Sequence, residues 1–281
     1  MREQRPAAVV GVHGIGNHDD ERTGDDAAEA LSKTWTEALA AGLGPHRQVD
    51  VLVAYYAERL RGETPQGSAD IEAVPGAVAV LDRWARALGM PAEQSQGRLT
   101  LPARYVLDWI ARRFGLDHRM VAWFVTRYCV EVARYLGDER VRSAVRDDVR
   151  RVIAQHRPKV VIAHSLGSVV AYEVLAAGEL PPVELLVTLG SPLGMPDVVF
   201  DRLDPPPVAG LGARPAGVRR WVNIADRGDL VAVPRLLSQR FHGVDADLEV
   251  SIAAFDFHRV IRYLACPVTA DAVAPWVDAA R

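Results

Sequence analysis

Short apolar runs alternate along the chain with longer segments in which apolar residues recur every three or four positions. Each apolar run is bounded by Gly, Pro or polar residues, which is typical of buried strands that end in tight turns. Five such strands are expected, at residues 7–12, 49–55, 159–163, 183–189 and 219–225, and the alternating pattern at 248–253 predicts a sixth. Helical spacing predicts helices at residues 25–41, 139–156, 167–177, 260–264 and 272–277. This alternation favours an α/β protein with a mostly parallel central sheet and helices on both faces.

The segment 58–136 breaks the alternation because it contains no clear strand pattern. It begins with a predicted loop at residues 62–76, which is rich in Gly, Pro and acidic residues. Three segments of helical character follow, at 77–89, 103–113 and 118–136. We therefore expect residues 1–57 and 137–281 to form the α/β core and residues 58–136 to form a helical, lid-like insertion above the sheet. An independent domain is the alternative for this segment.

The composition is that of an ordinary globular protein, with 281 residues, 49% of them apolar and 25% charged. These values exclude a disordered or collagen-like chain. The net charge of −3 gives no basic field, so no nucleic-acid partner is expected. Cys129 and Cys266 form no CxxC pair, which argues against a thiolate zinc site. Two free thiols are favoured over a disulfide between them.

The N-terminal region reaches a strand pattern almost at once, without an apolar run of signal-peptide length before it. No stretch of about 18 uncharged apolar residues occurs along the chain, so no membrane span is expected. Together with the free thiols, these features lead us to expect a cytoplasmic protein.

The most informative segment is the point where the apolar run 159–163 passes through Ser165 directly into a helical pattern. Ala163 and Gly167 stand two positions before and two after Ser165. A sharp strand-to-helix turn needs small residues there, because a larger side chain would collide with its neighbours. The following helix offers free N–H groups and a positive dipole end, which favour an anionic oxygen nearby. The pattern predicts Ser165 as a nucleophile, while Ser168 is expected to pack against the sheet.

Five segments run along the chain in an order that is typical of one enzyme family. They are His13-Gly14-Ile15-Gly16, Ala163-His164-Ser165-Leu166-Gly167, Thr188-Leu189-Gly190-Ser191-Pro192, Asp226-Arg227-Gly228-Asp229-Leu230-Val231 and Phe257-His258. In this order they resemble the α/β-hydrolase superfamily, in particular its lipase and esterase branch. The resemblance spans most of the chain outside 58–136 and implies an α/β-hydrolase fold. It identifies the superfamily more closely than the substrate.

The resemblance also implies an oxyanion hole, which is a pair of backbone N–H groups that binds the negative oxygen of the intermediate. In such enzymes one N–H comes from the loop after the first strand and one from the residue after the nucleophile. Here these are the N–H groups of Ile15 and Leu166. His13 is expected to be a hydrogen-bonded structural residue rather than a base. The run 17–20 is expected to be a solvated start of a helix rather than a metal site.

The acid of the catalytic triad is expected after the fifth strand, since the family order is Ser, acid, His. Asp229 is the first choice, because Leu-Val and a nearby Pro follow it as in the family pattern. Asp226 lies closer to the strand end and is the second choice, with a capping role as its alternative. Asp197 and Asp201, one strand earlier, are the remaining candidates.

The base is expected at His258, which lies 29 residues beyond Asp229, after the last predicted strand. Such a residue accepts the proton of Ser165, while the carboxylate holds its ring in the right tautomer. His242 is the rival base, but it precedes the last predicted strand and would lie at the wrong end of the sheet. His164 is expected to pack rather than titrate.

Aromatic residues and arginines interleave in the insertion. They are Tyr105, Trp109, Phe114, Trp123, Phe124, Tyr128 and Tyr135, with Arg112, Arg113, Arg119, Arg127 and Arg134. Amphipathic helices that bury their aromatic stripe on the core are the first interpretation. The functional interpretation is that these helices form a lid over an apolar acyl pocket. A more specific version is that the lid also makes transient contact with a lipid surface.

Together these features predict a serine hydrolase that cleaves carboxylic esters of small molecules or lipids through Ser165, His258 and Asp229. This chemistry requires no cofactor and no metal. Thioester hydrolysis or acyl transfer by the same triad is the alternative within enzymes. A hydrolase fold without catalytic activity, used as a binding module, is the alternative from another class.

Overall fold

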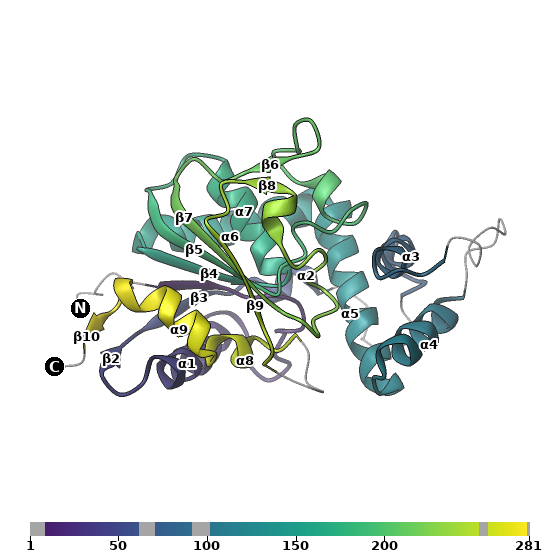
Figure 1. The fold of residues 1–281 in the computed structure, drawn as a ribbon, viewed down its shortest axis with the longest axis horizontal. Coiled ribbons are helices and arrows are strands. Elements are labelled where there is room, and N and C mark those ends of the chain that lie inside the picture. The colour runs from purple at the N-terminus through teal and green to yellow at the C-terminus, as the bar shows by residue number, and fades with distance from the viewer. Residues whose placement is uncertain (1–8, 62–70, 92–101, 253–257, 280–281) are drawn as a thin grey trace.

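The protein is built around a six-stranded sheet, shown here in a computed structural model that describes residues 9–61, 71–91, 102–252 and 258–279 (Figure 1). Its strands are β1 (Val9–Val12), β3 (Val51–Ala54), β4 (Val160–His164), β5 (Val183–Leu189), β7 (Val218–Asp226) and β9 (Ala246–Val250). The strand order is β3-β1-β4-β5-β7-β9, and every neighbouring pair runs parallel. The prediction of an α/β protein with a mostly parallel central sheet is therefore confirmed.

Helices cover both faces of this sheet (Figure 1). One face carries α1 (Gly24–Leu43), α8 (Val260–Leu264) and α9 (Pro267–Val273), and the other carries α6 (Glu139–His156) and α7 (Leu166–Ala176). Because successive strand side chains point to opposite faces, Val10 and Val161 pack on the α6 and α7 side. Val9 and Val160 pack with Trp35 of α1 on the other. Burial on both faces explains why the strands read as continuous apolar runs.

Two boundaries near the C-terminus differ from the prediction. The strand expected at 248–253 is β9, which starts earlier because its pairing with β7 runs from Ala246 to Val250. The helix expected at 272–277 is α9, which begins at Pro267 and ends at Val273. A 3-10 turn, η4 (Ala274–Trp276), continues it. Proline lacks a backbone N–H and favours the first turn of a helix, which accounts for the early start.

Several short elements were not predicted, since two to four residues are too few to show a periodicity. They are β2 (Arg47–Gln48) paired with β10 (Asp278–Ala279), β6 (Gly212–Ala213) paired with β8 (Phe241–His242), α2 (Ala57–Leu60), η2 (Phe200–Arg202) and η3 (Leu237–Gln239). Residues 7–8 of the first predicted strand, 62–70 of the predicted loop, residue 253 and Phe257 lie outside the described residues.

The described part of segment 58–136 is helical and contains no strand. Beyond the end of α2 it holds α3 (Ala77–Ala87), α4 (Ala103–Phe114) and α5 (His118–Gly137). Tyr128 and Tyr135 of α5 are fully buried in the hydrophobic cluster that also contains Val10 of the sheet. Trp123 and Tyr105 instead remain 59% and 39% exposed. The aromatic stripe is thus buried in part on the core and exposed in part on the surface.

Two further expectations concern thiols and membranes. Cys129 and Cys266 are both buried free thiols, as predicted. Among the described residues, no helix combines the length and the apolar character needed to cross a bilayer.

Candidate active site

The predicted residues gather at the carboxyl-terminal edge of the sheet. β1 and β4 are neighbours in the sheet. From β1 the chain continues to β3 on one side, and from β4 it continues to β5 on the other side. In open α/β sheets this point forms a crevice in which ligands bind. The loop 13–17 follows β1 and Ser165 follows β4, which places both at this crevice. Asp229 follows β7, the next strand but one, at the same edge.

Ser165 occupies a sharp turn between β4 and α7. Its φ of 55° and ψ of −131° are rare for a residue other than glycine. Gly167, two residues on, lies against the end of β1. A Cβ atom at Gly167 would come within 2.3 Å of the carbonyl oxygens of Val12 and His13. The small residue that the sequence pattern called for is therefore a steric requirement of this turn.

His258 and Asp229 form a buried pair. The Nδ1 atom of His258 lies 2.8 Å from Oδ2 and 3.0 Å from Oδ1 of Asp229. The carboxylate also accepts hydrogen bonds from the Tyr263 hydroxyl at 2.7 Å and the Val231 N–H at 2.8 Å. Burial alone would raise the pKa of Asp229, but His258 and these hydrogen bonds bring it below its ordinary value. An ionised carboxylate at Nδ1 keeps the proton there and leaves Nε2 free to accept another.

The buried side-chain atoms at this edge that have no hydrogen-bond partner include one atom each of Ser165, His258, His164 and Asp226. Ser165 Oγ and His258 Nε2 are both buried, and neither makes a hydrogen bond within the described residues. The ring of His164, the residue before Ser165, lies 4.6 Å from the ring of His258 between centroids. The structure thus brings the imidazole of His258 to the turn that carries Ser165. Buried polar atoms without partners are rare in folded proteins and call for an explanation, catalysis among them.

Gly190, at the end of β5, leaves room for the pair. A Cβ atom there would lie 2.6 Å from Asp229 Oδ2 and 3.1 Å from His258 Nδ1. Its φ of 53° is also one that favours glycine. A side chain at residue 190 of the predicted segment 188–192 would therefore collide with Asp229.

The rival acids have other contacts. Asp226 ends β7, and its Oδ1 accepts the N–H groups of Gly228 and Ile252 at 3.4 Å. Its own N–H donates to the Tyr263 hydroxyl at 2.8 Å, so Asp226 braces the turn before Asp229. Asp201 accepts the N–H of Asp197 at 2.7 Å on the surface. Within the described residues, none of these three carboxylates bonds to His258.

The rival nucleophile and the other histidines have different surroundings from Ser165 and His258. Ser168 Oγ donates to the carbonyl of Ser165 at 2.6 Å and lies 2.7 Å from Ser191 Oγ, within the framework of the turn. His242 lies exposed on β8. His164 is buried, and burial holds its pKa well below the ordinary value. His164 is therefore neutral and packs beside His258.

His13 is a structural residue of the loop after β1. Its Nε2 accepts the N–H of Tyr56 at 3.1 Å, and its Nδ1 donates to the carbonyl of Gly14 at 2.8 Å. Both ring nitrogens are thus used in the neutral form. Burial lowers the pKa of His13 to about 4, although the Gly14 bond opposes this.

The same loop carries one of the two predicted oxyanion donors, the N–H of Ile15. Asn17 Nδ2 donates to the carbonyls of Gly14 and Ile15, both at 3.0 Å. The N–H groups of Ile15 and Leu166 donate to no other described residue. Leu166 is the first residue of α7, where helical N–H groups have no intrahelical acceptor.

Three contributing residues escaped the sequence analysis: Tyr263, Glu131 and, as a loop anchor, Asn17. Burial raises the pKa of the Tyr263 hydroxyl far above its ordinary value, so it remains a donor to Asp229. Glu131 accepts the N–H of Gly16 from across the molecule. The one sequence signal for it was a lone acid in the apolar part of the helical segment 118–136. Asn17 was considered only as part of a metal site.

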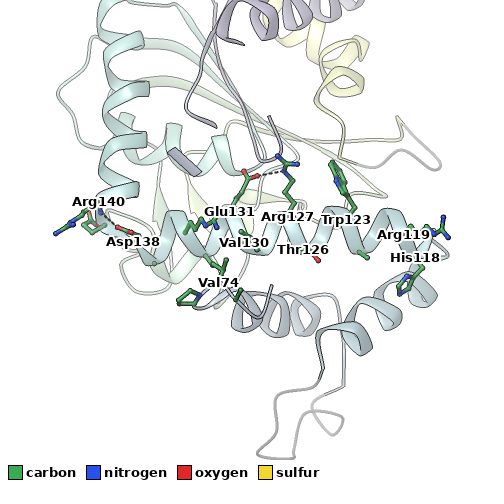
Figure 2. A pocket seen from close by; sticks show the side chains of 17 residues that line it. Val74, His118, Arg119, Trp123, Thr126, Arg127, Val130, Glu131, Asp138 and Arg140 are labelled. Carbon is green, nitrogen blue, oxygen red and sulfur yellow. Dashed lines mark hydrogen bonds and ion pairs between the residues drawn. The ribbon is translucent and has the colours of Figure 1, made fainter. Parts of the chain in front are cut away.

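A cavity of about 990 Å³ runs along α5 rather than at Ser165 (Figure 2). Val74, Trp123, Arg127 and Glu131 are among its lining residues, which include neither Ser165 nor the pair of His258 and Asp229. Glu131 nevertheless connects the cavity to the loop after β1. Of the residues that line this cavity, Glu131 and the neighbouring Arg127 approach the loop that carries Ile15.

Comparison with known proteins gives no relative: no family model, no curated protein and no solved structure matches the chain. Within the described residues, no group of three His, Cys, Asp or Glu side chains could hold a metal ion. In the run 17–20, Nδ1 of His18 lies 3.4 Å from Oδ1 of Asp20. Function is accordingly inferred from the side chains around Ser165.

Proposed function

We propose that this protein is a serine hydrolase of the α/β-hydrolase type that cleaves carboxylic esters through an acyl-enzyme intermediate. One observation carries the proposal. A buried His258–Asp229 pair presents an unpartnered Nε2 next to a strained turn on which Ser165 Oγ is also unpartnered. A nucleophile, a base and an orienting acid are the three groups that such catalysis needs.

In the first half of the reaction, Ser165 Oγ attacks the ester carbonyl carbon and its proton passes to His258 Nε2. Asp229 holds the ring by Nδ1 and stabilises the imidazolium that forms. The carbonyl oxygen becomes an anion, which the N–H groups of Ile15 and Leu166 bind. Backbone donors fixed in advance are effective because they need no reorganisation during the reaction.

In the second half, the tetrahedral intermediate collapses and the C–O bond to the alcohol breaks. His258 gives its proton to the departing alkoxide, which leaves the acyl group on Ser165. A water molecule then attacks this acyl-enzyme, with His258 again as the base. The carboxylic acid leaves and the Ser165 hydroxyl is restored.

The insertion bears on how a substrate enters. Ser165 has no exposed surface, and Phe124 of α5 packs edge-on against the ring of His258, with centroids 5.2 Å apart. An ester therefore reaches Ser165 only after side chains around it move. This supports a lid role for segment 58–136, and the exposed Trp123 and Tyr105 support transient contact with a lipid surface.

Substitution of the nucleophile tests the proposal. We expect Ser165→Ala to lower turnover of a short p-nitrophenyl ester by at least about 10³-fold, because the acyl-enzyme cannot form. Ser143→Ala is the matched control, and it should retain the activity because it removes an exposed hydroxyl on α6. Equal turnover in the Ser165→Ala variant and the unchanged protein would refute the proposal.

The same assay separates related activities. Parallel reactions with ester and thioester donors, each with and without an acceptor alcohol, distinguish ester hydrolysis from thioester hydrolysis and acyl transfer. A folded protein that turns over none of these donors would instead support a binding module without catalytic activity.

A further inference from the structure

Glu131 is a buried carboxyl group in the middle of a mostly apolar helix. It is only 5% exposed, and burial raises its pKa although the neighbouring Arg127 opposes this. Its Oε1 accepts the Nε–H of Arg127 at 3.1 Å, and Figure 2 shows the two side chains meeting on the same side of α5 as Trp123. Burying a carboxyl group costs free energy that an apolar side chain would avoid. Because of this cost, the hydrogen bond that Glu131 makes with a residue outside α5 needs an explanation.

That contact is with the loop that carries a predicted oxyanion donor. The N–H of Gly16 donates to both carboxylate oxygens of Glu131, at 3.1 Å and 3.3 Å. The arginine also lies close to the loop, since a Cβ atom at Gly16 would be 3.5 Å from Arg127 Nε. The φ of Gly16 is 76°, a conformation that few other residues adopt, so the loop itself is specialised.

The geometry of the peptide bond explains how this contact reaches the N–H of Ile15. A peptide unit is planar, so its carbonyl and N–H point in opposite directions. The unit between Gly14 and Ile15 is held at its carbonyl by Asn17 and by His13. The next unit, between Ile15 and Gly16, is held at its carbonyl by Asn17 and at its N–H by Glu131. Ile15 joins these two units, and Glu131 supplies the only one of these anchors that comes from outside residues 13–17.

We propose that Glu131 is a positioning residue that fixes the direction of the Ile15 N–H, and so makes α5 part of the oxyanion hole. This inference rests on the proposed function. Phe124, two helical turns before Glu131, contacts His258. One helix of the insertion thus touches both the base and the oxyanion loop, so a shift of α5 would disturb both together.

The test is to remove the acceptor while preserving the bulk of the side chain. In Glu131→Leu we expect kcat for the p-nitrophenyl ester to fall about 10- to 100-fold, somewhat less than the loss of an oxyanion donor itself. KM should stay within about threefold, because the anion forms only in the transition state. Rates are normalised to active sites counted by phosphonate titration, so that loss of folded protein does not contribute.

Two companion variants sharpen the result. Glu131→Gln keeps an oxygen that can accept the Gly16 N–H, and it should recover most of the kcat lost in Glu131→Leu. Glu139→Ala removes an exposed carboxylate that lines the same cavity away from the loop, and it should leave kcat unchanged. Should Glu131→Leu fail to fold, Glu131→Asp keeps the charge but withdraws the carboxylate by one methylene. It should also lower kcat at constant KM.

Failure of this inference is distinguishable from failure of the proposed function. If the unchanged protein turns over esters through Ser165 and Glu131→Leu or Glu131→Asp has the same kcat, only the positioning role is wrong. A fall in kcat that Glu131→Gln does not reverse would also contradict it. If the unchanged protein reacts with neither ester nor phosphonate, the proposed function fails and this inference fails with it.

Discussion

Three histidines lie within one small region, and their surroundings give them different chemistry. His13 and His164 are buried without a carboxylate bound to their rings, and burial lowers the pKa of each. His258 instead has Asp229 at Nδ1, which holds its ring in one orientation. The same residue type therefore serves as scaffold at two positions, and we propose it as the base at the third.

The buried His13 predicts how stability depends on pH. Because its pKa is about 4 in the folded protein and about 6.5 when unfolded, the unfolded chain binds the extra proton between these values. The free energy of unfolding should therefore fall as the pH falls from 6.5 to 4, by about 3 kcal/mol in total from this residue.

Urea unfolding at several pH values measures this contribution. His13→Gln keeps an acceptor for the Tyr56 N–H but cannot titrate. It should weaken the pH dependence by up to about 1.4 kcal/mol per pH unit in that window. An identical pH dependence in the two proteins would show that His13 is not held neutral by burial.

At the scale of elements, the position of Ser165 follows from how closely α7 approaches the end of β1. Gly167 in the first turn of α7 meets the backbone carbonyls of Val12 and His13 with no side chain between them. Such contact brings the loop after β1 next to the start of α7. The two predicted oxyanion donors come from these two elements.

Two glycine-to-alanine substitutions test how closely α7 approaches the end of β1. Gly167→Ala should lower the free energy of unfolding by about 3 kcal/mol or more, because a Cβ atom 2.3 Å from backbone oxygens cannot be relieved by rotating a side chain. Gly137→Ala, at the end of α5, meets nothing within 4 Å and should stabilise the protein by about 0.5–1 kcal/mol. Similar urea midpoints for the two variants would contradict the steric account.

At the scale of the whole molecule, the sequence was enough to predict the main fold. All six strands of the sheet were expected. Five of them are largely buried and produce apolar runs that a single sequence reveals, whereas the partly buried β9 showed itself by alternating apolar and polar residues. The short β2, β6, β8 and β10 were missed because two residues each are too few to show a periodicity. The predicted extent of β9 was wrong because its register with β7, which sets that extent, is not visible in the sequence.

The residues of the candidate site were likewise predicted only in part. Ser165 was predicted from a local turn pattern, and Asp229 and His258 from their order and spacing, which the resemblance supplied. Tyr263 was missed because it meets Asp229 across 34 residues, and Glu131 because it meets Gly16 across 115. Contacts of this kind depend on packing between elements, which periodicity does not encode.

The central claim is that the Ser165 hydroxyl, the His258 ring and two backbone donors converge on one reacting group. A crystal structure of the protein after reaction with an alkyl fluorophosphonate tests it most directly. We predict a bond from phosphorus to Ser165 Oγ, with the phosphoryl oxygen about 2.7–3.1 Å from the N atoms of both Ile15 and Leu166. Phosphorus bound to another residue, or a phosphoryl oxygen turned away from both N–H groups, would contradict the account.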